Sequence, residues 1–227
     1  MPIAVVTAYH EEPMDWLLQC NRSVLAQSIP CEHIVVSDGV RLDPPAGFQG
    51  QVLQLPYNHA NYGNTPRARG ARHAIENGFD AICWLDADNW FAPEHVAELV
   101  GADDSFDLAV SGRTIVDIDG SSPRVCPHAG PHLFDANCLL ARARGLEIAE
   151  FWENVPIEYA YFSDRFLQVL AIRNQLVVRR TNQPTVFYRD KRAAGDPERR
   201  GLAPLLAFWN QKSAAQREAL LKEWALI

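Results

Sequence analysis

Short apolar runs alternate with helical segments along the first hundred residues. Residues 3–7, 33–39, 51–55 and 81–85 form runs rich in Val, Ile and Leu, which are typical of buried strands. Helices are predicted between or after these runs, at residues 11–27, 64–78 and 92–100. This β-α-β order with short crossovers predicts an α/β fold, with a mostly parallel, Rossmann-like sheet flanked by helices.

The second half of the chain alternates less regularly. Residues 107–125 predict a strand followed by a hairpin that turns near Asp119 and Gly120. A helix at 157–175, two extended runs within 176–189 and a C-terminal helix at 213–227 follow. Ser213 and Gln216 have the spacing of a capping box. Because there is no repeat, low-complexity tract or linker, the whole chain is predicted to form one domain.

Two carboxylates, Asp86 and Asp88, stand directly after the apolar run at 81–85. Polar residues also follow the first two runs, at 7–11 and 37–39. Ligands of open α/β sheets bind beyond the carboxyl ends of the strands. Although Asp is also common in turns, the position of this pair after a buried strand favours a Mg²⁺ or Mn²⁺ site that shares substrate phosphates.

Further polar residues near these strand ends allow two interpretations each. Asp38, before Gly39, is either a turn residue or an acceptor for a base or ribose hydroxyl. Arg67, Arg69 and Arg72 lie on the predicted helix at 64–78. They form either a solvated helix face or a cationic site for a diphosphate.

Composition narrows the class of protein. The 227 residues carry a formal charge of −7, which argues against nucleic-acid binding. The five cysteines are scattered and include no C-x-x-C, so a reducing, cytoplasmic location is expected. No signal peptide or membrane-spanning run is apparent. A peripheral membrane contact and a homo-oligomer stay open.

Several motif classes are missing, and a different set of motifs is present. The sequence has no G-x-G-x-x-G, Walker or G-x-S-x-G motif. In order, it contains "AVVTAYHEEP", "SVLAQ", "IVVSDG", the helix "PRARGARH" and the strand end "LDAD". Together these motifs resemble the family-2 glycosyltransferases of GT-A fold over roughly the first hundred residues.

The resemblance implies a nucleotide-sugar-binding half, residues 1–100, and an acceptor-binding half with a C-terminal helix, residues 101–227. In the first half, the motifs assign the nucleotide base to Thr7, Tyr9 and Glu11, the base or ribose to Asp38, the nucleotide or diphosphate to Arg69, the ribose to Asp86 and the metal, Mn²⁺ or Mg²⁺, to Asp88.

The second half matches the family less closely. Its general base aligns with Asp164, but Ser163 replaces the acid that precedes the base in the family, and Glu158 is a competing acid. The resemblance places His128 and His132 in the acceptor-binding stretch, where they could contact the acceptor, a phosphate or the metal. Arg192 lies in a basic segment, 189–201, that is expected to act as a lid over the diphosphate.

An inverting glycosyltransferase is therefore the leading hypothesis for function. It would move a sugar from a nucleoside-diphosphate sugar, UDP-sugar favoured, to a carbohydrate, lipid-linked or small-molecule acceptor. One alternative is a nucleotide-sugar binding module without transfer activity, which the Ser163 replacement motivates. Another is a sugar-phosphate nucleotidyltransferase, although "TAYHEEP" lacks the glycines of its loop.

Overall fold

The computed structural model describes residues 1–126, 135–190 and 211–223. The described strands are β1 Ile3–Tyr9, β2 Glu32–Asp38, β3 Gln51–Leu55, β4 Ala81–Trp84, β5 Trp90–Phe91, β6 Leu108–Val116, β7 Arg124–Cys126, β8 Leu139–Arg142 and β9 Val178–Arg189. The α-helices are α1 Met14–Leu25, α2 Asn64–Glu76, α3 His95–Val100, α4 Asp164–Arg173 and α6 Ala214–Glu223. Short 3₁₀ helices are η1 Ala136–Cys138, η2 Ala143–Ile148, η3 Phe151–Asn154 and η4 Ile157–Phe162.

One mixed sheet organises these elements, in the order β3-β2-β1-β4-β8-β6-β9-β5, with β7 paired to β6. The four strands β3, β2, β1 and β4 are parallel, as predicted. Antiparallel pairing enters with the second half, because β8 runs antiparallel to both β4 and β6. The α/β prediction is therefore confirmed, and parallel pairing dominates its first half.

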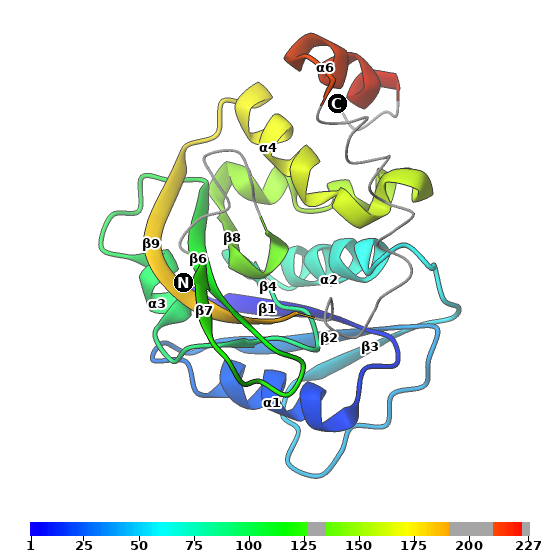
Figure 1. Ribbon diagram of the computed structural model, residues 1–227, viewed down its shortest axis with the longest axis vertical. Coiled ribbons are helices and arrows are strands. Elements are labelled where there is room, and N and C mark those ends of the chain that lie inside the picture. The colour runs from blue at the N-terminus through cyan, green and yellow to red at the C-terminus, as the bar shows by residue number, and fades with distance from the viewer. Residues whose placement is uncertain (127–134, 191–210, 224–227) are drawn as a thin grey trace.

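Figure 1 shows α1 and α2 on opposite faces of the parallel strands. Gly70 explains how closely α2 packs on the sheet. A Cβ at Gly70 would lie 2.3 Å from a Val6 methyl and 3.0 Å from a Val36 methyl, so no side chain larger than hydrogen fits. The helix ends at Glu76 and is closed two residues later by Gly78, whose backbone is left-handed, while the N–H of Phe79 donates to the Ala74 carbonyl in a Schellman arrangement.

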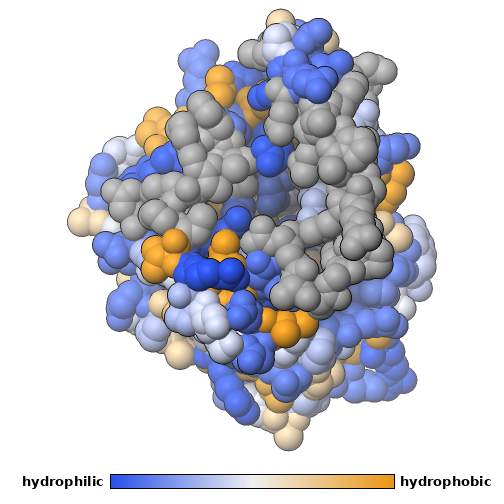
Figure 2. Space-filling model, in the orientation of Figure 1, coloured by the Kyte–Doolittle hydropathy of each residue, from blue (hydrophilic) through white to orange (hydrophobic). Residues whose placement is uncertain are grey.

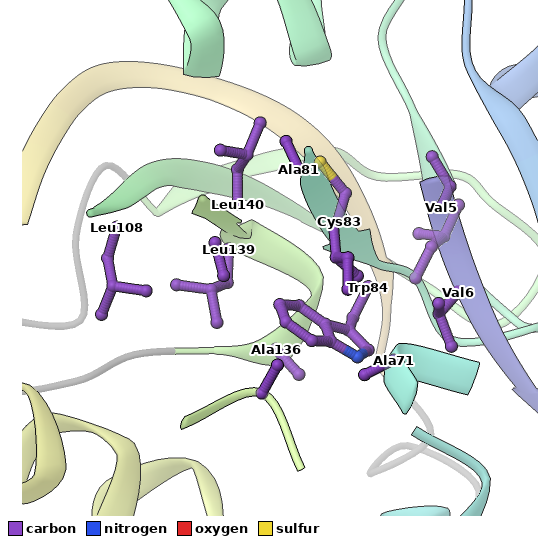
Figure 3. Packing of buried hydrophobic residues seen from close by; sticks show 14 of the residues in the cluster. Val5, Val6, Ala71, Ala81, Cys83, Trp84, Leu108, Ala136, Leu139 and Leu140 are labelled. Atoms are coloured by element: carbon purple, nitrogen blue, oxygen red, sulfur yellow. The ribbon is translucent and has the colours of Figure 1, made fainter. Parts of the chain in front are cut away.

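The main core packs around this sheet and contains residues from both halves of the chain. Trp84, at the end of β4, is fully buried, and its ring meets Trp152 edge-on at 4.9 Å. Figure 3 shows the Trp84 indole between Ala71 of α2 and Ala136 of η1. The core thus joins the first hundred residues to the later segments directly beside the end of β4.

Two predicted elements differ from the structure. The extended runs within 176–189 form the single strand β9, whose register on β6 shifts near Pro184. Proline has no N–H to donate, so the ladder is interrupted while the chain stays extended. The helix expected at 157–175 is divided into η4 and α4, with Ser163 between them. Among the described residues, no helix is long and apolar enough to cross a bilayer.

Candidate functional site

The carboxyl ends of β2, β1 and β4 lie side by side, because β1 pairs in parallel with both neighbours. Asp86, two residues past β4, is held from two directions. Its carboxylate pairs with Arg67 of α2 and accepts a 2.9 Å hydrogen bond from the Asn137 amide. The backbone N–H of Asp86 donates to the Asn137 side-chain oxygen at 2.7 Å. These bonds fix both the peptide and the carboxylate of Asp86.

The arginine at Asp86 is Arg67, whereas the sequence motifs assign the nucleotide or diphosphate to Arg69. Arg67 shares the buried face of α2 with Ala71 and Ala74, and its side chain is 11% exposed. Residues two apart on a helix point to nearly opposite sides. Arg69 accordingly pairs with Glu153 on the other side of α2, and its side chain is 46% exposed. In this structure Arg69 does not reach Asp86.

Asp164, the predicted base, begins α4 and lies at the same cluster. Its carboxylate accepts the backbone N–H of Ala136 at 3.2 Å. Burial raises the pKa of the Asp164 carboxyl above its ordinary value, and the charge of Asp86 acts in the same direction. The positive charges of Arg67 and Arg113 lower this pKa. The structure therefore brings Asp164, Asp86 and Arg67 into one electrostatic cluster.

Three further residues of this cluster escaped the sequence analysis. Asp135 pairs with Arg113 and accepts the N–H of Asn137 at 3.0 Å. The Arg113 guanidinium also lies 4.8 Å from the centre of the Tyr188 ring. Asn137 is 51 residues from Asp86, and no local pattern marks such a contact. Figure 2 shows one face of the molecule, on which the described residues are mainly hydrophilic with a few hydrophobic ones among them.

Asp88 is buried at the end of the same loop, beside Arg189 of β9. The Arg189 guanidinium donates to the Asp88 carbonyl at 3.1 Å, and the backbone N–H of Arg189 donates to the Asn89 side-chain oxygen at 2.9 Å. Trp16 and Trp90 cover the guanidinium, with ring centres at 4.8 Å and 4.6 Å. Such cation–π contacts hold the cation in place without neutralising it.

The side chains of the cluster could bind a metal ion only together with ligands from the substrate and water. Among residues 1–126, 135–190 and 211–223, no group of three or more His, Cys, Asp or Glu side chains could enclose an ion. Asp86 is already paired with Arg67 and Asn137. Asp88 supplies one carboxylate, which suits a Mg²⁺ or Mn²⁺ ion that takes its remaining ligands from substrate phosphates and water.

Asp38, at the end of β2, is engaged by His59. Its carboxylate accepts the backbone N–H of His59 at 3.2 Å and lies 2.6 Å from the His59 Nδ1 atom. The Asp38 carbonyl contacts the His10 ring at 2.9 Å. The Tyr57 ring lies 4.5 Å from that of His59, centre to centre. The carboxylate of Asp38, which the motifs assign to the base or ribose, is thus bound by His59 of the protein itself.

Thr7, Tyr9 and Glu11, at and just beyond the end of β1, differ in exposure. The Thr7 hydroxyl is fully buried and lies 2.8 Å from the His33 ring, so its side chain faces the core beneath α1. Tyr9 packs in a second apolar cluster, and burial raises the pKa of its hydroxyl. Glu11 alone is exposed. His128, His132 and Arg192 lie outside the described residues.

The fold and its strand-end cluster define an α/β protein with acids and arginines gathered at the carboxyl edge of the parallel strands. The family model "Glycosyl transferase family 2" matches residues 3–125. The chain belongs to this family, which confirms the resemblance seen in its motifs. A search of curated proteins finds no match.

Solved structures share the fold at low sequence identity. S. aureus TarS 1–349 in complex with UDP has a TM-score of 0.59 and 14% identity, over 84% of this chain and 61% of that one. The same TarS segment in complex with UDP-GlcNAc has a TM-score of 0.57 and 13% identity, over 84% and 59%. S. aureus TarS itself has a TM-score of 0.56 and 13% identity, over 99% and 43%. The GT-A type fold is confirmed, and the chain spans about three fifths of TarS 1–349.

Proposed function

We propose that the protein is an inverting glycosyltransferase that moves a sugar from a nucleoside-diphosphate sugar to an acceptor hydroxyl. The observation that carries the proposal is the meeting of Asp164, Asp86 and Arg67 at the carboxyl edge of the parallel strands. An acid with a raised pKa beside a cation and a second acid suits proton transfer next to a charged ligand. Family membership supports the same reaction class.

The donor is proposed to be a UDP-sugar, which agrees with the UDP and UDP-GlcNAc complexes of the structural neighbour. Asp86, which Arg67 and Asn137 hold at the strand end, would contact the ribose. Arg67 would face the diphosphate, and Asp38 with His59 would face the base. The donor would then lie across the ends of three adjacent strands, as ligands of open α/β sheets do.

Asp164 would act as the general base. It accepts the proton of the acceptor hydroxyl while that oxygen forms a bond to the anomeric carbon. The bond from that carbon to the diphosphate oxygen breaks on the opposite side, so the configuration inverts. The Ala136 N–H holds one carboxylate oxygen of Asp164 in place. A base positioned in this way contributes typically 10²–10⁴-fold to the rate.

Asp88 would hold Mn²⁺ or Mg²⁺ together with the donor diphosphate. When bound, such an ion offsets the charge that develops on the departing nucleoside diphosphate. Arg189 fixes the Asp88 peptide from the other side of the loop, which keeps the carboxylate at the edge of the sheet. Carbohydrate, lipid-linked and small-molecule acceptors all present a hydroxyl that this arrangement would accept.

The proposal is tested by following product release from UDP-sugars with a panel of acceptors and Mn²⁺. We expect acceptor-dependent UDP release and a glycosylated product with inverted configuration. UDP-sugar binding without release by any acceptor would indicate a binding module instead. Pyrophosphate released from a nucleoside triphosphate and a sugar phosphate would indicate a nucleotidyltransferase.

A further inference from the structure

Ser163, which stands where the family has an acid, is buried and bonded rather than exposed at the site. Its hydroxyl donates to the Asn64 side-chain oxygen at 2.9 Å. The Asn64 amide nitrogen donates in turn to the Ala160 carbonyl at 3.3 Å. Asn64 is fully buried and Ser163 nearly so, although 99 residues separate them. A buried hydrogen bond between two uncharged side chains therefore joins these distant segments.

The two bonded residues start the two helices that carry the reactive cluster. Asn64 is the first residue of α2, one turn before Arg67. Ser163 directly precedes α4, whose first residue is Asp164. A shift of either helix along this junction would therefore change the position of the Asp164 carboxylate relative to Arg67. The bond therefore joins the starts of the two helices directly beside the residues of the reactive cluster.

We propose that Asn64 and Ser163 form a positioning pair, which sets the Asp164 carboxylate against Arg67 and takes the place of the family's acid. This inference rests on the proposed function. On this proposal, the serine at position 163 supports activity in this chain and does not indicate a loss of the active site. Ser163 supplies the donor that the Asn64 oxygen requires, whereas an ionised carboxylate at position 163 has only acceptors.

Charge and burial explain why the family's acid would not suit this chain. A glutamate at position 163 would bring a carboxylate into a buried site beside the Asn64 oxygen, where the described hydrogen-bond partners, Asn64 and the Ala160 carbonyl, are uncharged. Burying an unpaired carboxylate is strongly unfavourable. Restoring the family's sequence here should therefore reduce activity, and the binding-module alternative predicts the opposite.

The kinetic test compares Ser163→Ala, Ser163→Thr and Ser163→Glu with the unmodified protein. A misplacement of about 1 Å costs as much as 10²-fold in rate. We expect Ser163→Ala to lower kcat by roughly tenfold to a hundredfold, with the KM for the donor nearly unchanged. Ser163→Thr keeps the hydroxyl and should restore most of the rate. The double variant with Asn64→Ala should lose no more than Ser163→Ala, because the two residues act as one unit.

A second measurement tests the positioning role of the pair without an activity assay. In a crystal structure of the Ser163→Ala protein, the Asp164 carboxylate should leave the Ala136 N–H, which it contacts at 3.2 Å in the unmodified chain. An unmoved carboxylate, an unchanged kcat for Ser163→Ala or a gain from Ser163→Glu would each overturn the positioning role. If the unmodified protein transfers no sugar, the proposed function fails, and the crystal structure alone judges the pair.

Discussion

Arg67 and Arg69 lie two residues apart on α2 and provide a matched pair of perturbations. We consider Arg67→Met and Arg69→Met. Each removes a guanidinium, and each keeps a long unbranched side chain with a favourable helix propensity. Only Arg67 pairs with Asp86 at the strand ends, whereas Arg69 pairs with Glu153 on the far side of the helix. The two variants therefore separate the effect of the site from that of the helix surface.

The expected magnitudes follow from exposure. Breaking a buried ion pair by removing one partner costs about 3–5 kcal/mol. The Arg67 side chain is 11% exposed and that of Asp86 27%, so partial solvation reduces this to about 2–3 kcal/mol for Arg67→Met. The Arg69 side chain is 46% exposed, and a surface pair contributes about 0–1 kcal/mol. For a chain of this length, Arg67→Met should lower the Tm by about 4–12 °C.

Two assays report the difference. Urea unfolding with an unchanged m-value gives the loss of stability, and calorimetry with UDP gives ligand affinity. We expect Arg67→Met to weaken UDP binding by about tenfold or more, because a charge-assisted contact to the diphosphate is lost. Arg69→Met should leave affinity within about twofold, given the distance of its ion pair from the cluster. Equal losses in both variants, or a larger loss for Arg69→Met, would refute the assignment of Arg67 to the site.

Three further predictions concern the base, the metal ligand and the core. Asp164→Asn should lower transfer by about a hundredfold or more with donor binding retained; near-normal turnover, with loss instead in Glu158→Gln, would move the base to Glu158. Asp88→Ala should abolish the Mn²⁺-dependent part of UDP affinity measured by calorimetry, and an unchanged metal dependence would contradict its role. Burial lowers the pKa of His33 to about 3, so the native state resists protonation below the ordinary value of about 6.5 and stability falls as pH drops. Urea unfolding between pH 6 and pH 4 should show His33→Gln losing about 1.4 kcal/mol less per pH unit than the unmodified chain, and parallel curves would exclude this coupling.

The parallel half of the fold could be predicted because its signals are local. Each apolar run is short, and the crossover helix α2 carries its own end signal in Gly78. Gly78, the last residue of the predicted helix at 64–78, closes α2. At the last helix, Ser213 and Gln216 exchange hydrogen bonds of 2.9 Å and 3.2 Å, which confirms the capping box. Such features depend on a few neighbouring residues and need no knowledge of tertiary packing.

The residues of the site were harder to predict from the sequence, because they depend on which face of α2 packs against the sheet. The motif alignment favoured Arg69 as the residue that faces the nucleotide or diphosphate. The buried side of α2 is marked by its small residues, Ala68, Gly70, Ala71 and Ala74. That stripe of small residues was the available signal for Arg67. Asn137 had no comparable signal, since its contact with Asp86 depends on the antiparallel pairing of β8 with β4. Long-range pairing of this kind cannot be obtained from periodicity.

The two acids after β4, Asp86 and Asp88, are held by residues from the first and the second half of the chain. Asp86 is fixed by Arg67 on α2, whereas the Asp88 peptide is fixed by Arg189 at the end of β9. Two tryptophans, Trp16 before the middle of α1 and Trp90 of β5, confine the Arg189 guanidinium. Residues 86–89 form a turn that is closed by a 3.0 Å hydrogen bond from the Asn89 N–H to the Asp86 carbonyl. Because Arg189 binds the Asp88 carbonyl, the two arginines do not compete for the same carboxylate. The loop therefore depends on β9 as much as on the parallel strands that lead into it, and a donor site built on these acids requires both halves of the chain.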